Sequence, residues 1–111
     1  MHVITTAALN DLGRRLGGPV DPARFRANVV VDTTESDRDW AGRELRLGSD
    51  VVLRIGAGMP RCVMVDLPQR GLGRDGRILT ALADEDDLCF GRQATVVRGG
   101  AVRRCDPAVL L

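Results

Sequence analysis

The sequence contains no lysine and no tyrosine, and its 16 basic residues are all arginine. A chain without lysine cannot form an internal Schiff base, which excludes pyridoxal-phosphate catalysis within this polypeptide. The only histidine is His2, so imidazole acid–base catalysis and a Ser-His-Asp arrangement have little basis here. The side chains that remain for catalysis or ligand binding are therefore cysteine, carboxylate and arginine.

Long apolar runs and paired cysteines are also missing. Cys62, Cys89 and Cys105 are widely spaced, and none belongs to a CxxC pair, so the sequence predicts neither a disulfide framework nor a zinc knuckle. No signal peptide is recognisable, and no apolar run approaches the about 20 residues that a membrane-spanning helix needs. We therefore expect a cytoplasmic protein with reduced thiols and no membrane partner.

The charges nearly cancel, with 16 basic against 15 acidic residues and a net charge of +1. No overall field draws such a chain to nucleic acid, and we expect no nucleic-acid partner. With 111 residues, 44% of them hydrophobic, the chain is large enough for one core and small for a cleft enzyme. We predict a single domain spanning residues 1–111.

Strands are predicted where β-branched residues run or alternate, and helices where apolar residues recur at helical spacing. Thr5 or Thr6 is expected to cap the first helix and Asp75 the second, while Trp40 is expected to anchor a polar loop to the core. Short strands with mostly hairpin-length connections predict a mainly β fold with helices, a small antiparallel β-barrel. The predicted strands are 2–6, 29–31, 44–48, 51–55, 62–67, 93–97 and 108–111, with a short continuation at 101–103, and the predicted helices are 7–16 and 78–83.

Cys62 is the leading candidate for chemistry because a fixed cation, Arg61, precedes it. A neighbouring guanidinium favours the thiolate, which would make Cys62 a soft-metal ligand or a nucleophile. The alternative is a small buried cysteine at the start of a strand, with Arg61 turned to solvent.

A second candidate is the alternating pattern Arg24, Arg26 and Asn28. If this segment is extended, the three side chains share one face. Two guanidinium groups and an amide in a row suit a phosphate, a carboxylate or an oxo-anion. The alternative is that they form the solvated face of a strand.

Several separated motifs agree with one family. The segment Arg24-Phe25-Arg26-Ala27-Asn28 is followed further along by Arg61-Cys62, Phe90-Gly91 and Asp106-Pro107. This order resembles the C-terminal part of MOSC domains, which are named for the C-terminal domain of molybdenum cofactor sulfurase and include the amidoxime-reducing component. The resemblance covers nearly all of the chain.

The resemblance implies a β-barrel that binds a pyranopterin molybdenum cofactor, as the better known members do. Cys62 corresponds to the metal-binding cysteine, and Arg26 and Asn28 correspond to residues near the cofactor's phosphate or dithiolene. With Arg24 and Arg61 added, these residues would hold anionic groups.

Asp66 could relay a proton at such a site. Some relatives reduce N-hydroxylated compounds, and others carry sulfur supplied by a separate pyridoxal-phosphate desulfurase. We therefore expect a small-molecule substrate, or a cysteine desulfurase or electron-transfer partner.

The chain departs from the family in ways that affect this expectation. Ala27 stands where members usually have proline, and Asp66 lies one place earlier than the usual acidic residue. Full-length members also have a long N-terminal portion that supplies barrel strands. We therefore expect a MOSC barrel that is incomplete at the N-terminus and has an exposed edge, through which the chain could form a homodimer. The alternative function is a non-catalytic, reduced barrel that acts through a partner or through self-association.

Overall fold

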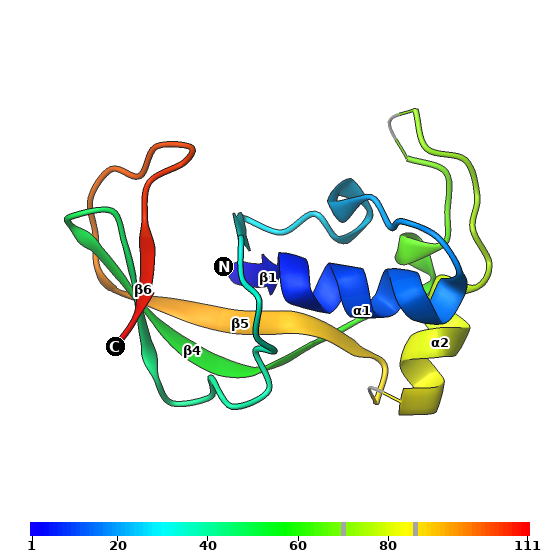
Figure 1. Ribbon diagram of the computed structural model, residues 1–111, viewed down its shortest axis with the longest axis horizontal. Coiled ribbons are helices and arrows are strands. Elements are labelled where there is room, and N and C mark those ends of the chain that lie inside the picture. Colours follow the sequence, from blue (N-terminus) through cyan, green and yellow to red (C-terminus); the bar gives the residue numbers. More distant parts are fainter. Residues whose placement is uncertain (70, 86) are drawn as a thin grey trace.

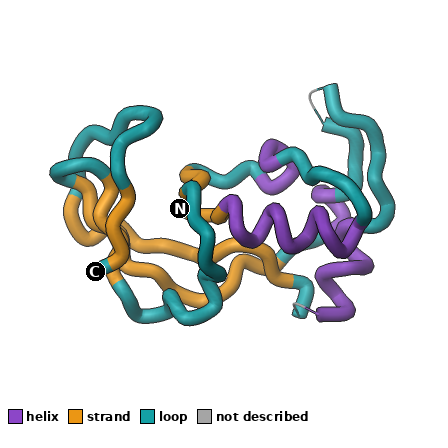
Figure 2. Tube along the Cα trace, viewed as in Figure 1, coloured by secondary structure: helices purple, strands orange, loops and turns teal. Residues whose placement is uncertain are grey.

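One curled sheet of six strands organises the molecule. In the computed structural model, which describes residues 1–69, 71–85 and 87–111, the strand order is β2-β1-β5-β4-β3-β6. The sheet forms a nearly closed barrel, with the helices gathered at one end (Figures 1 and 2). The elements are β1 (His2–Thr5), α1 (Thr6–Leu16), η1 (Pro22–Phe25), β2 (Val29–Val31), β3 (Glu44–Leu47), β4 (Val51–Pro60), η2 (Val63–Val65), α2 (Ile78–Glu85), β5 (Cys89–Arg98) and β6 (Ala108–Leu110).

All strand pairs are antiparallel except one, which confirms the predicted mainly antiparallel barrel. β1 and β2 pair in parallel, with Val3 opposite Val29. A parallel pair needs a long crossover connection, which α1 and η1 supply here. The remaining pairs, β1–β5, β5–β4, β4–β3 and β3–β6, are antiparallel.

The first helix begins and ends as its sequence predicts. The Thr5 hydroxyl accepts a hydrogen bond from the Ala8 backbone N–H at 3.2 Å, which is an N-cap contact. Gly17 ends the helix in the left-handed conformation, with φ of 80°. Both boundaries therefore follow from local side-chain and backbone chemistry.

Two hydrophobic clusters lie on the two faces of β1. Val3 packs with the barrel interior, together with Leu45, Leu53 and the predicted anchor Trp40. Ile4, its neighbour, points the other way into a cluster formed by the helices. Successive side chains of a strand alternate faces, so one short strand connects both cores. The helical cluster consists of Ile4, Leu9, Leu12, Phe25, Val65, Ile78, Leu82 and Phe90.

The predicted strand 62–67 is wrong. β4 instead runs through the glycines to Pro60, where it pairs with Cys89, the first residue of β5. Because β5 begins there, residues beyond Pro60 have no strand to pair with, and Val63–Val65 forms a short 3₁₀ helix. The predicted continuation at 101–103 is likewise not a strand. In the described parts of the chain, no helix is long and apolar enough to cross a bilayer.

Candidate functional site

The Cys62 thiol lies at the surface, just after the end of β4. Its residue is exposed, its backbone is extended with φ −127° and ψ −173°, and it stands at the N-cap position of η2. The side chain makes no capping hydrogen bond there. Neighbouring Val63 and Met64 are also exposed. The thiol is therefore accessible and unused by the fold, contrary to the alternative of a buried cysteine.

Arg61 turns inward rather than to solvent. Its Nε donates to the carbonyl of Phe90 at 3.0 Å, and its Nη1 donates to the carbonyl of Phe25 at 2.8 Å. The guanidinium carbon lies 5.2 Å from the centroid of the Phe25 ring, and that ring stacks on Phe90 with 4.1 Å between centroids. These contacts hold a cation in a fixed position one residue before Cys62.

The remaining nitrogen of Arg61, Nη2, is buried and has no hydrogen-bond partner among the described residues. Burial lowers the pKa of Arg61, while the nearby Cys62 and Cys89 thiols, when ionised, raise it. Arginine keeps its charge under such shifts because its ordinary pKa lies so high. The site therefore contains a fixed positive charge with one unused donor.

His2 contacts the Phe25 carbonyl that also accepts from Arg61, and Asn28 in turn contacts His2. His2 Nε2 lies 3.1 Å from the Phe25 carbonyl oxygen, and the backbone N–H of His2 donates to Asn28 Oδ1 at 2.8 Å. Burial lowers the pKa of His2, and the charge of Arg61 lowers it further. Asn28 thus ties the start of β2 to β1, with its oxygen already occupied.

The predicted shared face of Arg24, Arg26 and Asn28 is wrong, because the segment is not extended. Arg24 belongs to η1, and Arg26 ends η1 in the left-handed conformation with φ of 52°. Asp21 caps the turn by accepting from the Ala23 N–H at 2.9 Å. Arg24 and Arg26 therefore do not stand on one face of a strand.

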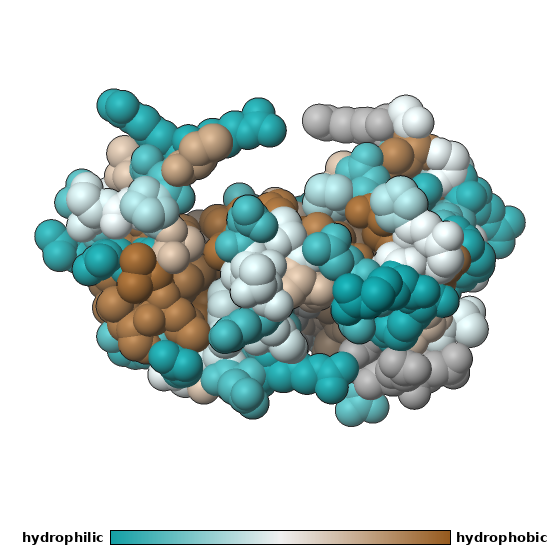
Figure 3. Space-filling model, in the orientation of Figure 1, coloured by the Kyte–Doolittle hydropathy of each residue, from teal (hydrophilic) through white to brown (hydrophobic). Residues whose placement is uncertain are grey.

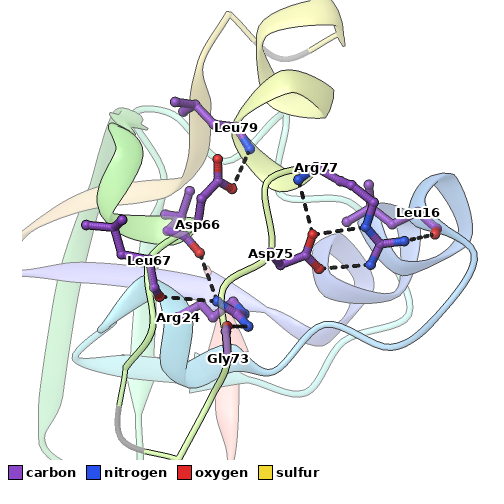
Figure 4. A network of polar contacts seen from close by, with 9 residues as sticks. Leu16, Arg24, Asp66, Leu67, Gly73, Asp75, Arg77 and Leu79 are labelled. Atoms are coloured by element: carbon purple, nitrogen blue, oxygen red, sulfur yellow. Dashed lines mark hydrogen bonds and ion pairs between the residues drawn. The ribbon is translucent and has the colours of Figure 1, made fainter.

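Arg24 is engaged with backbone, as Figure 4 shows. Its guanidinium donates to the carbonyls of Val65 at 3.3 Å and Leu67 at 3.4 Å, and also to that of Gly73. It therefore fastens the segment that follows Cys62. Arg26, in contrast, is exposed and directly follows the last residue of η1.

Asp66 is buried and caps the second helix. Its Oδ1 accepts from the Leu79 backbone N–H at 3.1 Å, at the first turn of α2 (Figure 4). Asp75, the predicted cap, accepts instead from the Arg77 backbone N–H at 3.1 Å, just before the helix begins. Asp66 and Asp75 thus both accept backbone N–H groups near the start of α2, where the sequence predicted Asp75 alone.

Sequence reasoning missed the neighbours that place Arg61. Phe25, Phe90 and His2 come from three separate elements, and no local pattern predicts their meeting. The sequence predicts no role for Cys89, although this residue lies close enough to affect the pKa of Arg61. Cys89 also lines a cleft of about 780 Å³ between α1, residues 34–38 and the start of β5.

The fold and the site together define a small β-barrel domain with an accessible thiol beside an anchored arginine. Residues 1–109 match the MOSC domain. The chain belongs to the MOSC domain family, as its sequence motifs predicted.

One protein of similar sequence and one solved structure of similar fold are both longer than this chain. It is 29% identical over 109 residues to mitochondrial amidoxime reducing component 2 of Rattus norvegicus, matching 98% of this chain and 27% of that protein. Its fold is similar to the crystal structure of YiiM from Geobacillus stearothermophilus, with a TM-score of 0.69 at 16% identity. That match covers 100% of this chain and 53% of the YiiM chain. The chain therefore spans only part of the length of each of these two proteins.

Proposed function

We propose that this chain is a molybdenum-cofactor-binding MOSC module of the reductase or sulfur-carrier type, with Cys62 as metal ligand or sulfur carrier. The observation that carries the proposal is the position of the Cys62 thiol. It is exposed, makes no capping contact, and follows directly after a cation that the fold holds in place. Membership in the MOSC family supports the choice of cofactor.

The donor set of the site suits a metal that arrives with its own sulfur ligands. Among the described residues, no group of three or more His, Cys, Asp or Glu side chains could hold a bare metal ion. A pterin dithiolene supplies soft sulfur ligands of its own, so one accessible protein thiolate is a sufficient addition. Cys62 fits that requirement, and the buried unused donor of Arg61 fits an anionic group nearby.

The other predicted residues divide into two roles. Arg26 is exposed and can approach a phosphate, and Asn28 can donate through its amide nitrogen. Arg24 and Asp66 act through the scaffold, because they fasten the segment after Cys62 to η1 and α2. When bound, the cofactor would supply the redox or sulfur-transfer chemistry, and the protein would position it beside Cys62.

Metal analysis of matched cysteine variants tests this proposal. The chain and the variants Cys62→Ser and Cys105→Ser would be produced in a host that makes the cofactor and purified under reducing conditions. Cys105 is also exposed but lies in the turn before β6, so its variant is the matched control. We expect the wild type and Cys105→Ser to retain molybdenum and Cys62→Ser to lose it about tenfold or more. Folded wild type without molybdenum, or equal metal in Cys62→Ser, would overturn the assignment.

The sulfur-carrier form of the proposal has its own test. The protein is incubated with a cysteine desulfurase, pyridoxal phosphate and cysteine, and intact mass is measured without reductant. Gain of one sulfur atom on the wild type and on Cys105→Ser, but not on Cys62→Ser, identifies Cys62 as the acceptor. Labelling of all three proteins alike would exclude a specific carrier role.

The open edge of the barrel favours a second candidate function, a non-catalytic module that acts by association with itself or with a partner. The strand order leaves β2 and β6 as edges, and exposed valines lie on both, Val30 and Val109. Size-exclusion chromatography with light scattering distinguishes the two functions. A stoichiometric complex or homodimer without metal would support the association module.

A further inference from the structure

The two edge strands of the barrel face each other across a groove. The groove has a volume of about 380 Å³ and is lined by Val31 of β2 and by Ala108 and Leu110 of β6. Trp40 and Leu45 contribute to its lining from the barrel interior. Figure 1 shows β6 and the N-terminal strands on opposite sides of this opening. We call the groove between these two edges the seam.

Strand directions determine what can close the seam. β2 runs parallel to β1, whereas β1–β5, β5–β4, β4–β3 and β3–β6 are each antiparallel. Following these reversals around the sheet, β2 and β6 run in the same direction. Direct contact between them would be a parallel pair. One additional strand running the opposite way would instead be antiparallel to both edges.

The backbone of β6 offers a free set of hydrogen-bonding groups to such a strand. The Leu111 N–H donates to Glu44 at 2.8 Å, and the Gly48 N–H donates to Pro107 at 2.8 Å. Alternate residues of an antiparallel strand bond to the same neighbour, so the odd-numbered residues of β6 face β3. The N–H and C=O groups of Ala108 and Leu110 therefore point into the seam.

The opposite edge has the same property. The Asn28 N–H donates to the His2 carbonyl at 3.0 Å and the Ala94 N–H donates to the Met1 carbonyl at 2.9 Å, so the even-numbered residues of β1 face β2 and the odd-numbered ones face β5. In the parallel register, with Val3 opposite Val29 and Ile4 opposite Val30, these even-numbered residues bond to Val29 and Val31. The backbone groups of Val30 consequently point away from β1, toward the seam.

The side chains that line the seam indicate which kind of additional strand could bind there. Its floor is apolar, formed by Val31, Leu45 and Leu110, and Figure 3 shows a hydrophobic surface at the end of the molecule where β6 terminates. The charged members of the described lining are Asp32 and Glu35, both acidic and exposed. They follow the C-terminal end of β2, and an antiparallel strand would place its N-terminal half beside them.

We propose that the seam is a docking site for one extended strand of a partner polypeptide. The strand is antiparallel to β2 and β6, has alternating apolar residues, and carries Lys or Arg in its N-terminal half. Charge complementarity to Asp32 and Glu35 gives the strand its direction. A second copy of this chain is a poor occupant, because a strand in the seam must pair on both sides, whereas β2 and β6 of a second copy each have one side already paired within their own sheet. The inference extends the association function proposed above and does not depend on metal at Cys62.

A pair of synthetic peptides tests both the docking and its direction. The probe is the capped heptapeptide Lys-Val-Arg-Val-Thr-Val-Thr, and the matched control is its reversed sequence, Thr-Val-Thr-Val-Arg-Val-Lys. Binding is measured by titration calorimetry, and the edge amides are followed by hydrogen exchange. We expect the probe to bind at least fivefold more tightly than the reversed peptide. It should slow exchange at Ala108, Leu110 and Val30 without changing Val109 or Val31.

Two protein variants complete the test. Ala108→Pro removes an N–H that points into the seam but not one that bonds to β3, so the variant should fold and bind the probe at least fivefold more weakly. The double variant Asp32→Asn with Glu35→Gln should bind the two peptides within about twofold of each other. No saturable binding, equal binding of both peptides to the wild type, or a stable homodimer whose edge amides are already protected would overturn the proposal.

Discussion

Arg61 and Phe25 are joined twice, because the guanidinium donates to the Phe25 carbonyl at 2.8 Å and also lies 5.2 Å from the centroid of its ring. The two residues are 36 positions apart in the sequence. This contact joins the segment 24–28 to the Arg61-Cys62 pair. The first segment supplies the carbonyl and ring that hold the arginine, and the arginine fixes the chain from which Cys62 projects.

Replacing Arg61 should therefore destabilise the fold. Arg61→Met keeps the aliphatic stem but removes the donors to the Phe25 and Phe90 carbonyls. Hydrogen bonds from charged groups contribute about 1.5–3 kcal/mol each, and partial exposure of this side chain reduces the total, so we expect a loss of about 2–3 kcal/mol. Urea unfolding measures the difference. Arg46→Met, an exposed position on β3, is the control and should change stability by less than about 0.5 kcal/mol.

The same cluster predicts how His2 titrates. Burial and the charge of Arg61 lower its pKa below 6.5, so the folded state binds fewer protons than the unfolded state between the folded pKa and 6.5. Stability should consequently fall as the pH drops through that window and level off below it. The NMR titration midpoint of the imidazole should lie below that of the urea-unfolded protein. Arg61→Gln should raise the midpoint, and an unchanged midpoint would show that the two groups do not interact.

The sequence predicted the elements whose signals are local. Thr5 and Gly17 bound α1 through hydroxyl and backbone chemistry that neighbouring residues reveal. Trp40 is buried where a lone indole in a polar loop is expected. The Arg61-Cys62 pair left an accessible and a buried cysteine open, and the structure has the accessible one.

The failures come from contacts between distant segments. Residues 62–67 have strand-like composition, but a strand needs a neighbour, and β5 begins opposite Pro60. The alternation of Arg24 and Arg26 has the period of a strand, yet Asp21 and Pro22 start a 3₁₀ turn before it. Gly91 is explained only by tertiary structure, since a Cβ there would lie 2.7 Å from Ile4 Cγ2 of the adjoining strand.

Two substitutions at Asp66 separate its structural role from a role in proton transfer. Asp66→Ala removes the acceptor for the Leu79 N–H and should cost about 1 kcal/mol, by analogy with the loss of a helix cap. Asp66→Asn keeps an oxygen at that position, so it should retain most of the stability although it cannot carry a proton. The free energy of unfolding is measured with denaturant, and the reductase activity proposed above is measured on protein loaded with the molybdenum cofactor. Asn at wild-type stability but without activity would favour the proton relay, whereas full activity would leave only the cap.

Arg24 and Arg26 should respond in opposite ways. Arg24→Ala removes the donors to Val65 and Leu67, so amide exchange over residues 65–69 should accelerate about tenfold or more, in line with local opening. Arg26→Gly relieves a left-handed conformation and should raise the unfolding free energy by up to about 1 kcal/mol. Unchanged exchange in Arg24→Ala would show that the guanidinium of Arg24 does not hold the segment.

The ion pair between Asp75 and Arg77 predicts behaviour at acid pH. The hydrogen bonds from Arg77, including one at 2.8 Å, lower the pKa of Asp75 from 3.8 to about 2. A carboxyl whose folded pKa is depressed stabilises the protein above its unfolded pKa, and that contribution is lost as the pH falls from 3.8 through about 2. Arg77 is largely exposed, so salt should weaken the effect.

Unfolding free energies measured between pH 2 and 6 would show this dependence. Asp75→Asn should flatten the curve over the interval from 3.8 to about 2, while Asp39→Asn, at an exposed position, should leave its shape unchanged. Arg77→Gln should move the Asp75 midpoint back toward 3.8 in a carboxyl NMR titration, because the dominant cause of the shift is the side-chain contact with Arg77. A midpoint that stays near 2 in Arg77→Gln would mean that another influence, such as the charge of Arg24, keeps the pKa of Asp75 low.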